Sequence, residues 1–251
     1  MITVTAQPYI SRTTFLVQFE VDTSIRFKLG EIERAFQSVC QTQGVSTNVP
    51  DSAPAAIPRI TLQSGPKSIA VSQVTTQLDM DFSEQRKSVR NTFDILQKNV
   101  ELFWTGVMSF KSTAEIGHAG LVVTVASPSQ LPKGKICASI LDRYAKIPNR
   151  GESAQASIQF GYLDAEHHMF NNVAISNYEM RSGAIEMGSA KRLQIDVSSL
   201  PLKEEGVEIK FDFNSRPMGM SQVTTPPDLA QLLIRSMQDC VFGWGSDFIK
   251  W

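Results

Sequence analysis

The sequence predicts an α+β protein made of two similar halves, each an antiparallel sheet with helices on one face. Three observations predict this class. Alternating apolar and polar residues indicate strands, apolar residues three or four positions apart indicate helices, and the elements recur in the same order after about residue 110. A solenoid repeat is much shorter, about 20 to 50 residues. We therefore interpret residues 1–110 and 111–251 as the products of an internal duplication.

The first half opens with a strand, followed by a helix and a hairpin. Phe15, Val17 and Phe19 occupy every second position, which predicts a strand with one well-buried face. Apolar residues at helical spacing then predict a helix over about 29–43. The turn sequence SGPK at 64–67 separates two short apolar runs and predicts a hairpin.

The second half repeats this order from Leu121 onward. A strand is followed by a predicted helix over about 131–145 and by strands over about 156–163 and 170–180. An extra strand pair over about 191–214 distinguishes this half from the first.

A helix rich in aromatic residues is predicted to close each half, over about 85–107 and 226–249. We expect the first to begin near Ser83, whose hydroxyl can cap a helix. The second begins at the sequence TPPD, with proline at the first helical position and a carboxylate in the first turn. Both present one apolar stripe, which favours packing on a sheet over a coiled coil.

Composition excludes several classes of protein. The 251 residues are 42% hydrophobic, enough for a sizeable core. The net charge is -1 and no basic block occurs, which disfavours binding to nucleic acid. No apolar run is long enough to span a membrane and no signal peptide precedes the first strand, so we expect a cytoplasmic protein. Three isolated cysteines, one in each of three predicted helices, indicate core positions rather than disulfides or a metal site: Cys40, Cys137 and Cys240.

Two groups of polar residues could carry chemistry. One cluster has the residue types of a metal site but a poor spacing, because adjacent histidines on a strand point to opposite faces; it comprises Asp164, Glu166, His167 and His168. A polar hairpin turn is the preferred interpretation. Asp79 and Asp81 share one face of a strand, where a carboxylate pair could act as acid and base but more often forms a solvent-exposed edge.

Three segments and the aromatic end of the last helix occur in an order that carries a family resemblance. The segments are ITLQSGP at 60–66, EIGHAGLV at 115–122 and IKFDF at 209–213. This order resembles a sporadically distributed family of uncharacterised bacterial proteins of similar length. The family has an arginine-glycine-leucine-arginine-tyrosine run where this chain has Gly117, Ala119, Gly120 and Leu121 without the basic residues. The resemblance implies no agreed activity and transfers no functional residue.

These observations favour a non-catalytic protein-binding or assembly protein, without a cofactor, that contacts another protein or a second copy of itself. The candidate contact surfaces are exposed sheet edges and the aromatic C-terminal helix. The residues expected at the contact are Trp104, Trp244, Phe248 and Trp251. Two alternatives remain open: a metal-dependent enzyme built on the Asp164 cluster, and a small-molecule or nucleic-acid binder in a cleft between the halves.

Overall fold

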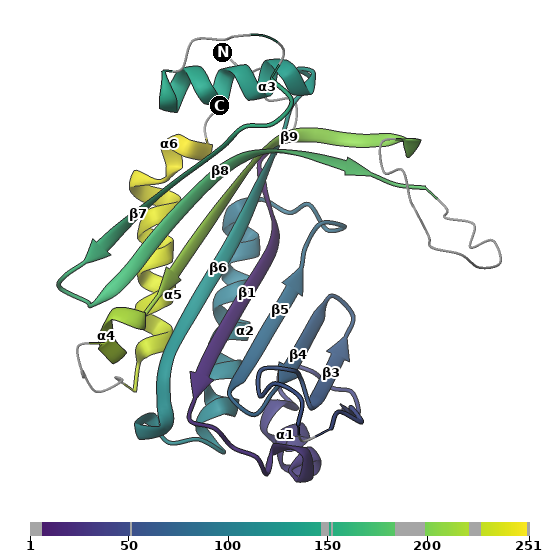
Figure 1. Cartoon of the computed structure of the whole chain (residues 1–251), viewed down its shortest axis with the longest axis vertical. Helices are drawn as coiled ribbons and strands as arrows, with labels where there is room; N and C mark the ends of the chain where they lie inside the picture. The colour runs from purple at the N-terminus through teal and green to yellow at the C-terminus, as the bar shows by residue number, and fades with distance from the viewer. Residues whose placement is uncertain are drawn as a thin grey trace.

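The protein is built around one antiparallel sheet. The computed structural model describes residues 7–50, 52–146, 151, 153–183, 199–220 and 227–249, apart from the side chains of residues 219, 220 and 249. In this part of the chain nine strands form a single sheet in the order β2-β3-β4-β5-β1-β6-β9-β8-β7 (Figure 1). The predicted α+β class with antiparallel strands is confirmed. The N-terminal strand lies at the centre and β7 lies at one edge.

The strands and helices have the following bounds. The strands are β1 (Tyr9–Phe19), β2 (Val45–Ser46), β3 (Ile60–Ser64), β4 (Lys67–Val71), β5 (Thr75–Asp81), β6 (Ile116–Pro128), β7 (Ser157–Asp164), β8 (Met169–Arg181) and β9 (Leu202–Asn214). The helices are α1 (Leu29–Phe36), α2 (Val89–Met108), α3 (Lys133–Ile140), α4 (Arg216–Met220), α5 (Leu229–Asp239) and α6 (Ser246–Ile249), with π-helical turns at Leu141–Ala145 and Cys240–Trp244. Of the predicted extra strand pair, residues 191–197 lie outside the described residues and the other strand is β9.

The two predicted halves contribute to the same sheet, whereas the sequence predicts a sheet in each. The reason is the central pair, in which β1 and β6 run antiparallel from Tyr9 opposite Ala126 to Phe19 opposite Ile116. From this pair outward, the strands of the first half follow the order β1-β5-β4-β3 and those of the second half the order β6-β9-β8-β7. The backbone hydrogen bonds of the sheet therefore continue without interruption from the strands before residue 110 to the strands after it.

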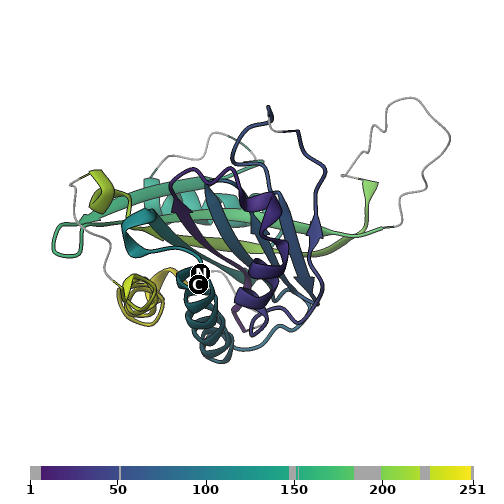
Figure 2. The ribbon, with the colours of Figure 1, turned by 90° about the horizontal axis from the view of Figure 1, so that it is seen from below.

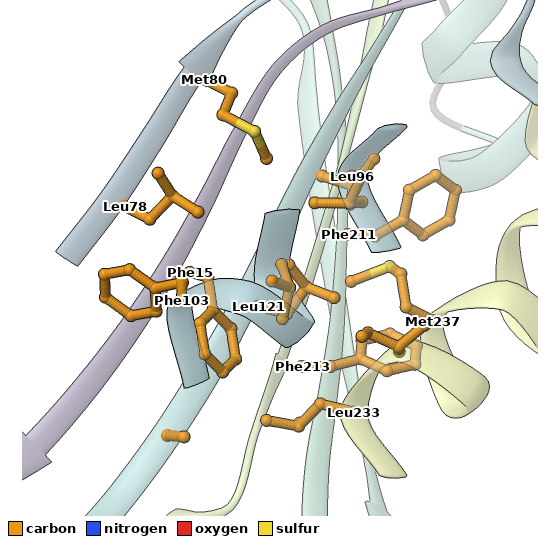
Figure 3. Close-up of a cluster of buried hydrophobic side chains, with 14 of the residues drawn as sticks. Phe15, Leu78, Met80, Leu96, Phe103, Leu121, Phe211, Phe213, Leu233 and Met237 are labelled. Atoms are coloured by element: carbon orange, nitrogen blue, oxygen red, sulfur yellow. The ribbon is translucent and has the colours of Figure 1, made fainter. Parts of the chain in front are cut away.

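One face of the sheet, here called the covered face, packs against the helices. Figure 2 shows α2 and α5 side by side on this side of the sheet. Figure 3 shows the apolar side chains that meet there, and all of the labelled ones are at most 1% exposed: Phe15, Leu78, Met80, Leu96, Phe103, Leu121, Phe211, Phe213, Leu233 and Met237. Burial of this surface is the main contribution to the stability of the fold.

Close packing between helices also depends on one glycine. A Cβ atom at Gly106 of α2 would lie 2.7 Å from the carbonyl oxygen of Ala35 and 2.7 Å from the ring of Phe36. The absence of a side chain at this position lets α1 approach α2 closely enough for the rings of Phe36 and Phe103 to stack at 5.0 Å.

The helix that the sequence predicts over residues 29–43 is shorter in the structure, where α1 ends at Phe36.

Candidate functional site

The opposite face of the sheet, here called the open face, is the candidate site. In Figure 1 its central strands β1, β6 and β9 are seen in front of α2 and α5. Side chains alternate between the two faces, so the residues that follow or precede each buried position point toward the open face. By strand register, the central residues of this face are Arg12, Thr14, Asp79, Asp81, Val122, Thr124, Glu208, Lys210 and Asp212.

Three adjoining depressions cross the open face at its centre. The middle one has a volume of about 480 Å³ and lies over β1, β6 and β9. It shares Thr14 and Val122 with a second depression of about 190 Å³ toward His118. It shares Arg12 and Asp81 with a third of about 620 Å³ that extends over β4 and β5. Together they form a surface that crosses the junction between the two halves of the chain.

Asp79 and Asp81 both lie on this face, but they do not act on a common proton or cation. The Asp79 carboxylate accepts hydrogen bonds of 2.6 Å from Thr14 Oγ1 and Gln77 Nε2 and lies 3.5 Å from the Arg12 guanidinium. The Asp81 carboxylate instead accepts from the Ser83 backbone and hydroxyl at 2.9 and 2.6 Å. Each carboxylate therefore orients its own neighbours, as expected of a hydrated strand face.

Two titratable groups that line these depressions have shifted pKa values. Burial raises the pKa of Glu208, and the nearby Lys210 ammonium partly opposes that rise. Burial lowers the pKa of His118, and the adjacent Arg216 guanidinium lowers it further. A half-buried carboxylate and a half-buried imidazole in connected depressions are typical of surfaces that bind a ligand. Here they lie on the neighbouring strands β9 and β6, where Glu208 lines the central depression and His118 lines the smaller one beside it.

A fully hydrogen-bonded cluster closes one end of the open face. Glu204 Oε1 accepts hydrogen bonds from the hydroxyls of Tyr9 at 2.9 Å and Tyr178 at 2.7 Å. Its Oε2 lies 2.6 Å from the Arg86 guanidinium, which also stacks over the Tyr9 ring at 5.2 Å. Burial, followed by the Glu204 carboxylate, raises the pKa of Tyr9 to about 12 and raises that of Tyr178 further. These groups satisfy one another, so we regard the cluster as structural.

The segment that carries the alternative metal site is a hairpin turn between β7 and β8. The Asp164 carboxylate accepts from the His167 backbone at 3.0 Å and contacts His167 Nδ1 at 2.9 Å, while His168 has a left-handed φ of 49°. Within the described residues, no group of three or more His, Cys, Asp or Glu side chains could hold a metal ion. Glu166 therefore joins no such group, and the local bonds explain Asp164 and His167 as a turn. The preferred interpretation of this segment as a turn agrees with these contacts.

The predicted contact residues separate into three groups. Trp104 is only 8% exposed and its Nε1 donates to the Pro227 carbonyl at 2.9 Å, so it is a core residue rather than a surface residue. Trp244 is 48% exposed and lies 6.2 Å from the half-buried Phe248 ring, so the structure brings these two together. Trp251 lies outside the described residues.

The open face itself was not recognised from the sequence. Its signal is the polar half of each alternating strand, as in Glu208, Lys210 and Asp212 between buried apolar residues of β9. Such alternation predicts a hydrated face but does not show that neighbouring strands align their polar residues. The alignment comes from the pairing of β1 with β6 and of β6 with β9.

Comparisons with known proteins give no further guide to the site. No family model, curated protein or solved structure matches this chain. In the described part of the chain, no helix is both long and apolar enough to cross a membrane.

The predicted cysteine environments are confirmed, since all three thiols are free and buried.

Proposed function

We propose that this chain is a non-catalytic binding protein whose open face docks a partner protein. The observation that supports this most directly is the centre of the sheet, over which no described helix lies on the open face and where β1, β6 and β9 present polar side chains around the 480 Å³ depression. Folding requires only one buried face of an antiparallel sheet, and the other is free for recognition.

The charges around the depressions favour a protein over a nucleic acid. Cationic and anionic groups alternate along the surface: Arg12, Lys210 and Arg216 face Asp81, Glu208 and Asp212. Nucleic-acid affinity depends on clustered cations that neutralise phosphates. A polypeptide carries both signs of charge and can match an alternating surface, so a protein partner is the better fit.

Glu208 defines the chemistry expected of that partner. Its pKa is raised by burial, so the ionised form lacks sufficient compensation in the free protein. Among the described residues, no group donates a hydrogen bond to this carboxylate. A lysine or arginine from the partner would supply both a charge and donors. We therefore expect the bound segment to place a basic side chain beside Glu208.

We also propose that the two halves arose by internal duplication. In this correspondence β1 matches β6, α1 matches α3, the β3, β4 and β5 strands match β7, β8 and β9, and α2 matches α5. The identical outward order of the strands supports it. The central depression would then be a product of fusion, because it contains residues of both halves.

Site-specific photo-crosslinking in cells tests the proposed function. A benzoylphenylalanine at Thr124 would report contacts in the central depression, and the same group at Lys98, on the exposed side of α2, is the matched control. We expect a discrete adduct from Thr124 alone. Mass spectrometry of the adduct should identify a basic segment of one partner protein.

Charge reversal makes this experiment decisive. Glu208→Lys should abolish the Thr124 adduct, because it repels the expected basic side chain, whereas Asp94→Lys on the exposed side of α2 should leave the adduct unchanged. Circular dichroism would confirm that both variants remain folded. Equal adducts from Thr124 and Lys98, or an adduct indifferent to Glu208→Lys, would overturn the proposal.

A further inference from the structure

The two edges of the sheet differ in how they are protected. At one edge, β2 has only two residues, Val45–Ser46. At the other, β7 presents eight residues, Ser157–Asp164, with Asp164 at its end as the single charged residue and no proline. In the described part of the chain, the backbone hydrogen-bond partner of β7 is β8 alone. A long edge strand with no proline and a charge only at its end can pair with another strand.

Exposed apolar side chains border this edge on both faces of the sheet. On the covered side, Tyr162 is 48% exposed and stacks edge-to-face with Trp244 at 5.5 Å. On the open side, Leu163 is 65% exposed and its cross-strand neighbour Phe170 is 38% exposed. An added strand would cover apolar surface on both faces while it completes the backbone hydrogen bonds.

Aromatic rings also pack against β7 on both faces of the sheet. A Cβ atom at Gly161 would collide with the Phe170 ring, so the missing side chain lets that ring lie flat across β7. On the other face, the rings of Phe160 and Phe248 pack at 5.4 Å. The backbone of β7 is thereby supported from both sides, which lowers the entropy lost when a further strand pairs with it.

From this edge we infer that β7 pairs antiparallel with β7 of a second copy of the chain. A two-fold axis perpendicular to the sheet keeps each face on its own side, so directly opposed residues must share a face. The register centred on Phe160 satisfies this condition. It places Tyr162 opposite Ile158 of the second copy on the covered side, and Leu163 opposite Ser157 on the open side.

A second copy fits this edge for two reasons. Phe160 faces its own equivalent, and Ile158 and Tyr162 are exchanged symmetrically, so the apolar side of the strand is complementary to itself. The Asp164 carboxylates lie beyond the opposed residues, so the pairing places no like charges opposite each other. The result is one continuous sheet in which the open faces of both copies lie on the same side.

A charge placed at the edge tests the dimer. Leu163→Lys introduces a cation at the most exposed apolar position of β7, and Phe27→Lys, at a side chain that is 83% exposed on the 3-10 turn Ile25–Phe27, is the matched control. In sedimentation velocity, we expect the unmodified chain and Phe27→Lys to be dimeric. Leu163→Lys should weaken dimerisation by about tenfold or more. A monomeric unmodified chain would overturn the inference and leave an extended segment of another protein as the occupant.

Engineered cysteines test the register independently of affinity. In the inferred pairing, Ser157 of one copy faces Leu163 of the other at a Cα separation of about 4.5 to 5.5 Å, within reach of a disulfide. The double variant Ser157→Cys, Leu163→Cys should therefore form a covalent dimer on mild oxidation, whereas Ser157→Cys alone should not. The native cysteines are buried and give little background. A dimer that forms no disulfide in the double variant would exclude this register. The test is independent of the open-face partner, because it uses the purified chain alone.

Discussion

The two faces of the sheet carry the same alternation but differ in burial and polarity. On the covered face, side chains such as Phe15 and Phe211 are at most 1% exposed and pack among the helices. On the open face, Glu208 and His118 are half-buried and their pKa values are shifted by burial. The first face is arranged so that its groups stabilise the fold. On the open face, burial makes the charged forms of Glu208 and His118 less favourable. Shifted pKa values of this kind are common at functional sites.

The largest effect that would test this contrast is a cavity on the covered face. Phe103 is fully buried and packs against Phe15 at 5.7 Å and Phe36 at 5.0 Å. We predict that Phe103→Ala lowers the free energy of unfolding by about 3 to 5 kcal/mol, because lost contacts and a residual cavity add together. Denaturant unfolding measures this loss.

A matched change on the open face provides the control. Thr124→Ala removes a small half-buried side chain from the central depression. We expect it to change the free energy of unfolding by less than about 0.5 kcal/mol. Comparable losses of stability from both variants would contradict the claim that the covered face stabilises the fold more than the open face does.

The sequence predicted the local elements more completely than their arrangement. Alternation placed the first strand and the 64–67 turn correctly, because these depend on neighbouring residues. The helix predicted from Ser83 begins later, at Val89, since Ser88 accepts the capping hydrogen bond from Asn91 and Asp81 holds Ser83 in a turn. Two serines five residues apart offer similar caps, and the tertiary structure selects one.

Long-range pairing explains what the sequence did not predict. The joining of both halves into one sheet depends on contacts between β1 and β6, which lie about a hundred residues apart. The same pairing creates the candidate site. Trp104 shows the related limit for single residues, because its position on the stripe of α2 fits a core or a contact equally well until the Pro227 carbonyl is placed beside it.

A smaller effect is expected at the closed end of the open face, where pH changes the Tyr9 cluster. The pKa of Tyr9 is raised to about 12 and that of Tyr178 is raised as well, whereas an unfolded tyrosine ionises near about 10. The folded state therefore holds these protons more tightly than the unfolded state. The resulting contribution to the free energy of unfolding is complete below pH of about 10 and is lost as pH rises toward 12.

The measurement is the free energy of unfolding between neutral and strongly alkaline pH. We expect a steeper decline for the unmodified chain than for Tyr178→Phe, which removes one of the two shifted hydroxyls. Tyr162→Phe is the control, because that tyrosine lies outside the cluster. Parallel declines in the unmodified chain and Tyr178→Phe would show that the cluster does not hold its protons more tightly than the unfolded chain.

The smallest change in the free energy of unfolding is expected for a substitution of Glu208. It should be a gain in stability, whereas substitutions on the covered face should cause a loss. Because burial raises the pKa of this carboxyl, ionisation is less favourable in the folded state than in the unfolded state. Its contribution to stability is therefore fully present below the ordinary glutamate pKa and is lost as pH rises through the raised pKa of the folded state. We predict that Glu208→Gln raises the free energy of unfolding at neutral pH by less than about 1 kcal/mol, with no gain in acid. The same variant should weaken the Thr124 photo-crosslink, since a neutral amide cannot form an ion pair with a basic partner residue. A variant that is more stable but no longer binds would show that Glu208 is retained for recognition. Destabilisation at neutral pH would instead place Glu208 among the groups that hold the fold together.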